Sequence, residues 1–305
     1  MLSLYPDLSL IRGYTPEDDL AQRPVVVTHF QRDQKSFYYL NAHHVTGIEN
    51  TTCHTVRQAI RAFKPQLVIV EGLPTEAGPS PNFYIDYANR QAARSFVSGE
   101  PAYAAFLAHQ NHIPFVGGEP THTAIVTSME REGYSVKDIM AFYLLRALPQ
   151  ERREGKPINE AHFAEWSAHY LQQYFSYMPQ QERLTIDEFK AWYDSHKADS
   201  KHFLEISTGD FAPYASPVGN YFQEFSHRLS RIRDGHLCTL IAEVLSSHDR
   251  VLVVYGDGHL VKTHRVFEKM LGQGAIIQLE SNRVTAPARF SASKKVARDR
   301  APLQF

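Results

Sequence analysis

The chain has 305 residues, with 32 Lys and Arg against 33 Asp and Glu, and a net charge of −1. A hydrophobic content of 43% and an aromatic content of 12% exclude a disordered chain, and the balanced charge gives no general attraction for nucleic acid. No run approaches the ~18 apolar residues of a membrane span, and no secretion signal opens the sequence, so we expect a cytoplasmic protein whose two cysteines stay reduced.

The first part of the chain alternates short apolar runs with amphipathic segments. The runs predict strands at 24–30, 36–42, 66–72 and 112–118, and the amphipathic segments predict helices at 51–63 and 101–111. A strand, a helix and a second strand in this order indicate a βαβ unit.

The middle of the chain changes in character. Amphipathic spacing predicts helices at 129–148, 158–175 and 184–195, the last opened by a capping box of Thr185 and Glu188. We interpret this part as a helical insertion, whose many aromatic side chains either cover a ligand or fill a core.

The last part returns to the pattern of the first. Residues 219–247 predict a long helix or a broken pair, residues 250–260 predict a buried strand, a Gly-rich turn and a helix start, and 275–279 predicts a last strand. The element order predicts an α/β fold with a central, mostly parallel, mixed sheet flanked by helices.

This interpretation divides the chain into four parts. They are the N-terminal half of the α/β core at 1–120, the helical insertion at 121–205, the C-terminal half of the core at 206–280, and a tail at 281–305. The tail holds six basic side chains and one acidic one, and we expect it to be flexible.

Polar side chains follow four of the predicted strands. They are His43 and His44, Glu71, Glu119 and His122, and Asp257 and His259. Because ligands bind outside the carboxyl ends of parallel strands, we expect His44, Glu71, Glu119 and His259 to line one pocket.

Two segments carry a family resemblance. NAHHVTGIENTTCHTVRQAIRAFKPQLVIVEG resembles the opening motif of the TraB/Tiki superfamily, GTxH followed by a helix and PDxVxVEL, with Asn41 in place of the glycine. RIRDGHLCTLIAEVLSSHDRVLVVYGDGHL is similar to the second signature, an Arg followed by Asp or Asn on a helix and then a strand ending in GxxH. The resemblance covers roughly 36–72 and 228–280. The wider group includes erythromycin esterase-like enzymes and ChaN-type haem-binding lipoproteins.

The candidate residues also have structural interpretations. Glu71, at the end of an apolar strand, needs a cation or donors, and a salt bridge to Arg233 would provide them. The two glycines before Glu119 either let a ligand approach the backbone or form an ordinary turn. Asp257 is expected to form an Asp-Gly turn. His259 begins a helix, whose dipole favours the neutral imidazole.

The residues and the resemblance together predict a hydrolase that activates water to cleave a peptide, ester or amide bond of a small-molecule or peptide substrate. In a metal-dependent version, His44, His259 and either Glu71 or Glu119 bind a divalent ion (Mn, Co, Zn or Fe), the other carboxylate accepts a proton, and Arg233 stabilises the oxyanion. In a metal-free version, a neutral His44 oriented by Glu71 activates the water. The alternative is a haem- or metabolite-binding protein of ChaN-like type without turnover.

Overall fold

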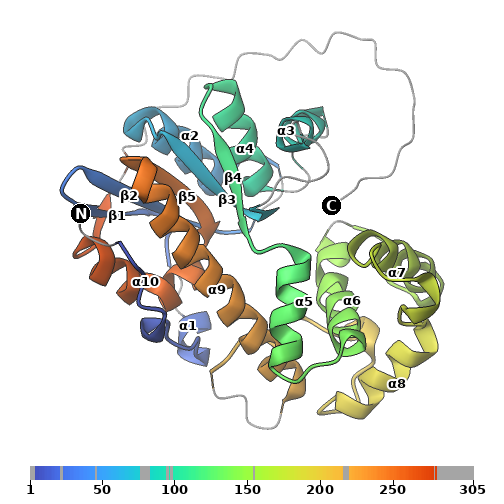
Figure 1. The fold of residues 1–305 in the computed structure, drawn as a ribbon. Coiled ribbons are helices and arrows are strands. Elements are labelled where there is room, and N and C mark those ends of the chain that lie inside the picture. Colours follow the sequence, from blue (N-terminus) through green and yellow to red (C-terminus); the bar gives the residue numbers. More distant parts are fainter. Residues whose placement is uncertain are drawn as a thin grey trace.

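A computed structural model describes residues 4–20, 23–44, 47–75, 83–93, 96, 99–153, 155–215, 220–277 and 279 (Figure 1). The described residues form one mixed sheet of six strands flanked by helices, which confirms the predicted α/β fold. The tail at 281–305 lies outside the described residues. None of the described helices has the length and apolar character needed to cross a membrane.

The sheet places four parallel strands side by side. Its strands are β1 (Val27–Arg32), β2 (Lys35–Ala42), β3 (Leu67–Pro74), β4 (Phe115–Glu119), β5 (Arg250–Gly256) and β6 (Ala275–Ile277), in the spatial order β4-β3-β5-β2-β1-β6. The strands from β4 to β2 are parallel, and β1 and β6 add antiparallel pairs at the other side. The carboxyl ends of β2, β3, β4 and β5 therefore meet at one edge.

Helices cover both faces of this sheet (Figure 1). The helices associated with the sheet are α1 (Pro16–Leu20), α2 (Thr51–Phe63), α3 (Phe83–Ala93), α4 (Glu100–Gln110), α9 (Tyr221–Ser247) and α10 (Asp257–Leu271). Successive side chains of a strand point to opposite faces. In β5, Val253 and Tyr255 accordingly pack with α9 and α10, whereas Leu252 and Val254 pack with α2 and α4.

A separate helical region follows β4. It contains α5 (His122–Arg131), α6 (Val136–Arg153), α7 (Glu160–Tyr174) and α8 (Ile186–His196). A short 3-10 turn at Gln180–Glu182 lies between α7 and α8, two more follow α8 at Phe203–Glu205 and Thr208–Phe211, and another lies near the N-terminus at Leu8–Leu10. The single helix predicted at 129–148 is two helices, because Gly133 adopts a φ of 94° between them. Helix α3 was not predicted from the sequence.

Helix α9 joins the helical region to the sheet. Its 27 residues extend about 40 Å, enough to span both parts of the molecule. Phe222, Phe225 and Leu229 in its first half belong to the core of the helical region, and Leu237 and Ile241 in its second half belong to the core beneath the sheet. The helical core thus extends beyond the boundary expected at residue 205. The middle of α9 lies near the carboxyl edge of the sheet (Figure 1).

Candidate active site

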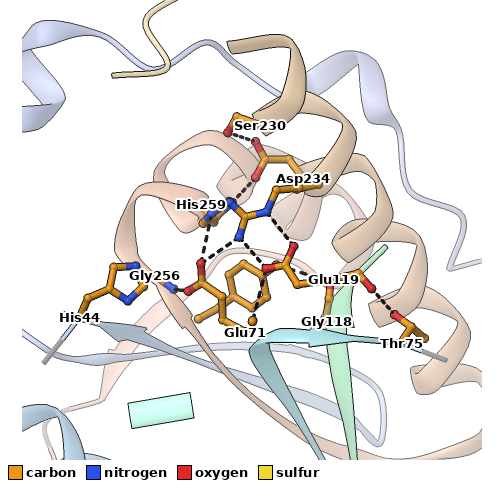
Figure 2. A network of polar contacts seen from close by, with 12 residues as sticks. His44, Glu71, Thr75, Gly118, Glu119, Ser230, Asp234, Gly256 and His259 are labelled. Carbon is orange, nitrogen blue, oxygen red and sulfur yellow. Dashed lines mark hydrogen bonds and ion pairs between the residues drawn. The ribbon is translucent and has the colours of Figure 1, made fainter. Parts of the chain in front are cut away.

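The strand ends bring the four expected side chains together (Figure 2): Glu71, Glu119 and His259 share one polar network, and His44 lies beside it next to Gly256. His44 follows β2, Glu71 lies within β3, Glu119 ends β4, and His259 begins α10 after β5. These residues are far apart in sequence, and the parallel order of the strands is what brings them together. Arg233, from the middle of α9, connects the two carboxylates.

Arg233 is held by two buried carboxylates. Its Nε and Nη2 donate to Glu119 Oε2 and Oε1 at 2.7 and 2.5 Å, and Nη2 also donates to Glu71 Oε1 at 3.0 Å. The salt bridge that the sequence offered as the structural interpretation of Glu71 is therefore present. Burial opposes charge on Arg233, but Glu119, Tyr255 and Glu71 together outweigh burial and raise its pKa well above the usual value.

Glu119 is held in place by Tyr255 and Arg233. The Tyr255 hydroxyl donates to its Oε1 at 2.6 Å. Burial raises the pKa of Glu119, but Arg233, Tyr255 and His259 together outweigh burial and lower the pKa to about 2. The two preceding glycines make room for protein atoms rather than for a ligand. A Cβ at Gly118 would lie 2.7 Å from the Tyr255 ring, and one at Gly117 would lie 2.1 Å from the Leu73 carbonyl oxygen.

Both oxygens of Glu71 have partners. The Gly256 amide donates to Oε2 at 2.7 Å, opposite the bond from Arg233 to Oε1. His259 Nε2 lies 3.6 Å from Oε1. Burial favours the neutral carboxyl, but the positive charges around it, led by His44, outweigh burial and lower the pKa of Glu71. Glu71 is thus an anion between two imidazoles.

His259 is a neutral base by its surroundings. Its Nδ1 lies 2.5 Å from Oδ1 of the fully buried Asp234. Because a carboxylate only accepts hydrogen bonds, Nδ1 carries the proton and Nε2 keeps its lone pair. Burial lowers the pKa of His259, and Lys262 lowers it further against the opposing effect of Asp234.

His44, like His259, has a carboxylate at Nδ1, but its surroundings raise the pKa of the ring instead of lowering it. Its Nδ1 lies 2.8 Å from Oε1 of Glu100, a carboxylate on α4 whose side chain is 2% exposed. Glu71 and the bond from Glu100 raise the pKa of His44 to about 9. The His44 side chain is 60% exposed, so water screens part of this attraction. The sequence analysis expected a neutral His44 oriented by Glu71, and this expectation is wrong. Glu100 orients the His44 ring, and the cationic form of the ring is favoured.

Gly256 marks the centre of the group. A Cβ added there would lie 3.2 Å from Glu71 Oε2, 3.5 Å from His44 Nε2 and 3.7 Å from His259 Cδ2. The two imidazoles and the carboxylate therefore face one small volume next to the glycine. The Tyr39 hydroxyl donates to the Gly256 carbonyl at 3.1 Å and fixes this turn of the backbone.

Other strand-end residues take structural positions. Asp257 is the first residue of α10 and pairs with Arg23 at 2.6 Å, instead of forming the expected Asp-Gly turn. His122 begins α5 and packs edge-on against Phe175 and Tyr143 at centroid distances of 4.5 and 5.1 Å. The helical region thus starts three residues after Glu119, with aromatic side chains near the site.

Sequence reasoning did not identify four of the residues that build the site. Asp234, Glu100, Tyr255 and Lys262 each contact a predicted site residue or its partner. Asp234 stands next to Arg233 in the motif quoted above, and Tyr255 precedes the GxxH element, so both had a local signal. Glu100 and Lys262 had none, since their contacts depend on how α4 packs on the sheet and α10 packs on α9.

The described residues do not form the expected metal site. No group of three or more His, Cys, Asp and Glu side chains among them could hold a metal ion. Each Glu71 oxygen accepts a hydrogen bond, Oε2 from the Gly256 amide and Oε1 from Arg233, and the positive charge of this guanidinium opposes the binding of a cation to the carboxylate. The described side chains therefore do not fit a divalent ion as they stand.

Comparison of the chain with family models, with curated proteins and with solved structures gives no match. The resemblance to the TraB/Tiki superfamily therefore stays a prediction.

Proposed function

We propose that the protein is a hydrolase in which an imidazole, rather than a metal ion, activates water to cleave an ester, amide or peptide bond. The observation that carries the proposal is the pair of histidines around Glu71, each held at Nδ1 by a buried carboxylate, with pKa values moved in opposite directions. Two titratable groups whose surroundings separate their pKa values are the usual arrangement of a general acid and a general base.

His259 takes the role of the base. Its ring is neutral near pH 7, and its Nε2 lies 3.6 Å from Glu71 Oε1. Both atoms are hydrogen-bond acceptors, so a donor is needed next to them. A water molecule in that position can donate one proton to each acceptor. This hydrogen bonding orients the water and prepares it to lose a proton to Nε2.

His44 takes the role of the acid. It lies at the exposed side of the group, and its raised pKa keeps Nε2 protonated at neutral pH. Glu100 holds the other nitrogen, so the ring keeps its orientation as it gains or loses this proton. A leaving group that departs toward solvent would pass this side chain.

The reaction balances with these groups alone. As the water oxygen bonds to the carbonyl carbon, its proton passes to His259 and negative charge develops on the carbonyl oxygen. Arg233 stabilises that charge, with Nη1 as the guanidinium nitrogen that makes no hydrogen bond to the described residues. The bond to the leaving group then breaks, and the leaving oxygen or nitrogen takes the proton of His44.

The substrate class follows from the exposure of the group. His44 is open to water while Glu71 and His259 are buried, so the scissile carbonyl enters from the His44 side and the substrate is a small molecule or an extended peptide. We place the enzyme in the cytoplasm, where the buried Cys53 and Cys238 would stay reduced.

The test is hydrolysis of a panel of chromogenic esters, a lactone and an amino-acid anilide by the purified protein. We expect turnover of at least one, and a fall in kcat of about 10²–10⁴-fold in His259→Asn, the range of general-base catalysis. His264→Asn, on the same helix and 38% exposed, is the matched control and should keep the activity. His44→Gln should abolish the fall in rate that deprotonation of His44 produces near pH 9.

Two results would overturn the proposal. One is the absence of turnover of every ester, lactone and anilide in the panel at substrate concentrations up to about 1 mM, the upper end of common KM values. The other is a His259→Asn variant as active as His264→Asn, since the base would then lie elsewhere.

A further inference from the structure

Behind His259 lies a buried lysine that the proposed reaction does not use. Lys262 is three residues further along α10, and its side chain is 6% exposed. Its Nζ lies 2.6 Å from Asp234 Oδ2 and also donates to the hydroxyl of Ser230. The backbone carbonyl of Lys262 accepts a hydrogen bond from Arg12 at 3.0 Å, so the N-terminal segment packs over the same turn.

A buried ammonium needs an explanation, because an apolar side chain could connect α10 to α9 as well. Removing a charge from water is unfavourable, and buried ion pairs contribute little net stability compared with apolar packing. The contact divides the oxygens of Asp234 between two partners, with Oδ1 facing His259 and Oδ2 facing Lys262. Asp234 therefore does not direct its full charge at the imidazole.

We infer that Lys262 is a positioning residue for the base: by balancing the charge of Asp234, it lets that carboxylate hold His259 through Nδ1–H as a neutral ring whose Nε2 remains an acceptor. The inference rests on the proposed function, in which His259 is the base. Without the ammonium, an unbalanced buried carboxylate 2.5 Å from Nδ1 would favour the imidazolium, which has no lone pair.

The charges around His259 agree with this role. Lys262 lowers the pKa of the imidazole and Asp234 raises it, so the two act against each other on the same ring. The titratable and charged groups that face His259 from the surrounding elements are Glu71 from β3, Glu119 from β4, Tyr255 from β5, Arg233 and Asp234 from α9, Lys262 from α10, and His44 after β2. Among the described groups, Lys262 is the cation that contacts the carboxylate holding Nδ1.

The experiment measures the ring itself. The nitrogen chemical shifts of the histidine side chains are recorded against pH in the full chain, with His259 assigned by its loss in His259→Asn. We expect a neutral Nδ1–H ring at pH 7 in the wild type. In Lys262→Gln, which keeps hydrogen-bonding capacity and removes the charge, we expect the pKa of His259 to rise by about one unit or more, a tenfold change in protonation equilibrium.

Two further variants separate charge from packing. The double variant Asp234→Asn with Lys262→Gln removes both charges and should return His259 to a neutral ring near pH 7. Lys269→Met removes a lysine that is 61% exposed on the same helix and should leave the His259 titration unchanged. Thermal unfolding of each variant shows whether it is folded, and Lys262→Met serves in place of Lys262→Gln should the latter not fold.

A merely structural lysine would give a different result. In that case the Lys262 variants would lose stability while His259 titrated as in the wild type, and the inference would be wrong. Because the nitrogen shifts need no substrate, they also separate this inference from the proposed function. A protein without hydrolytic activity whose His259 still responded to Lys262→Gln would contradict the function and leave the effect of Lys262 on the ring established.

Discussion

The sheet layer and the helical region bury their side chains in different ways. Of the charged residues that the described structure buries, Glu71, Glu100, Asp234 and Lys262 lie at the carboxyl edge of the sheet, and Glu151 lies in the helical region. The helical region instead packs aromatic rings, such as Phe142 on Phe225 at 4.2 Å. Buried charges are costly unless paired, and their concentration in one place is what the proposed active site would require.

Helix α9 contains both kinds of environment and allows a direct comparison. Arg228 in its first half is 44% exposed and pairs with the equally exposed Glu132 at 3.2 Å. Arg233, less than two turns later, is 16% exposed and pairs with two carboxylates that are only 9% and 13% exposed. The same residue type on the same helix thus makes a surface ion pair in one region and a buried one in the other.

The largest effect that we predict comes from separating these two arginines. Arg233→Met leaves Glu71 and Glu119 buried without their cation, and we expect a loss of about 3–5 kcal/mol in the free energy of unfolding. Arg228→Met breaks an exposed pair and should cost less than about 1 kcal/mol. Urea unfolding followed by circular dichroism measures both. Equal losses would mean that the buried cluster contributes no more than a surface pair.

A second prediction concerns how the stability of the protein depends on pH through Glu119, at the carboxyl edge of the sheet. The pKa of Glu119 is lowered to about 2 in the folded protein from an ordinary value of 4.5. A depressed carboxyl pKa contributes stability that is present above pH 4.5 and is lost as the pH falls toward 2. We expect the urea midpoint of the wild type to drop across this window.

The matched comparison for this pH effect is Glu119→Gln. It should be less stable than the wild type at pH 7, and the difference between the two should shrink as the pH falls from 4.5 to 2, because the wild type then carries a neutral carboxyl as well. A difference that stayed constant through this window would show that Glu119 does not carry the acid sensitivity.

The contrast between the regions also explains what the sequence could predict. His44, Glu71, Glu119 and His259 were expected at one edge because each follows or ends an apolar run, a signal contained in a few neighbouring residues. The continuous apolar run that became β5 likewise predicted a buried strand of the sheet. These features depend on local periodicity and on the parallel order of strands, so they could be predicted without the structure.

The electrostatic roles could not be predicted in the same way. Glu71 and the hydrogen bond to Glu100 favour the His44 cation, whereas burial and Lys262 lower the pKa of His259 against the opposing effect of Asp234. Glu100, Asp234 and Lys262 come from helices whose packing sets these contacts. The break at Gly133 was missed because one glycine within an apolar pattern is also compatible with a continuous helix. Tertiary placement, which a single sequence does not contain, decides these points.

The smallest effect that we predict is that of a chelator. The metal-dependent version expected from the sequence places a divalent ion between His44, His259 and either Glu71 or Glu119. The metal-free version expected from the sequence uses His44 and Glu71 without an ion. Arg233 already donates to Glu71 at 3.0 Å and is held there by Glu119, so a divalent ion would have to displace a guanidinium fixed by three hydrogen bonds. We therefore expect exhaustive dialysis against EDTA to change neither the melting temperature nor the rate of hydrolysis, and elemental analysis to find less than one transition metal per chain.

The informative variant is Arg233→Met assayed with added Mn, Co or Zn. In the metal-free enzyme these ions should not restore activity beyond a small fraction, whereas a melting temperature or a rate that falls on chelation of the wild type and returns with one of these ions would establish the metal-dependent version and reject the one proposed above.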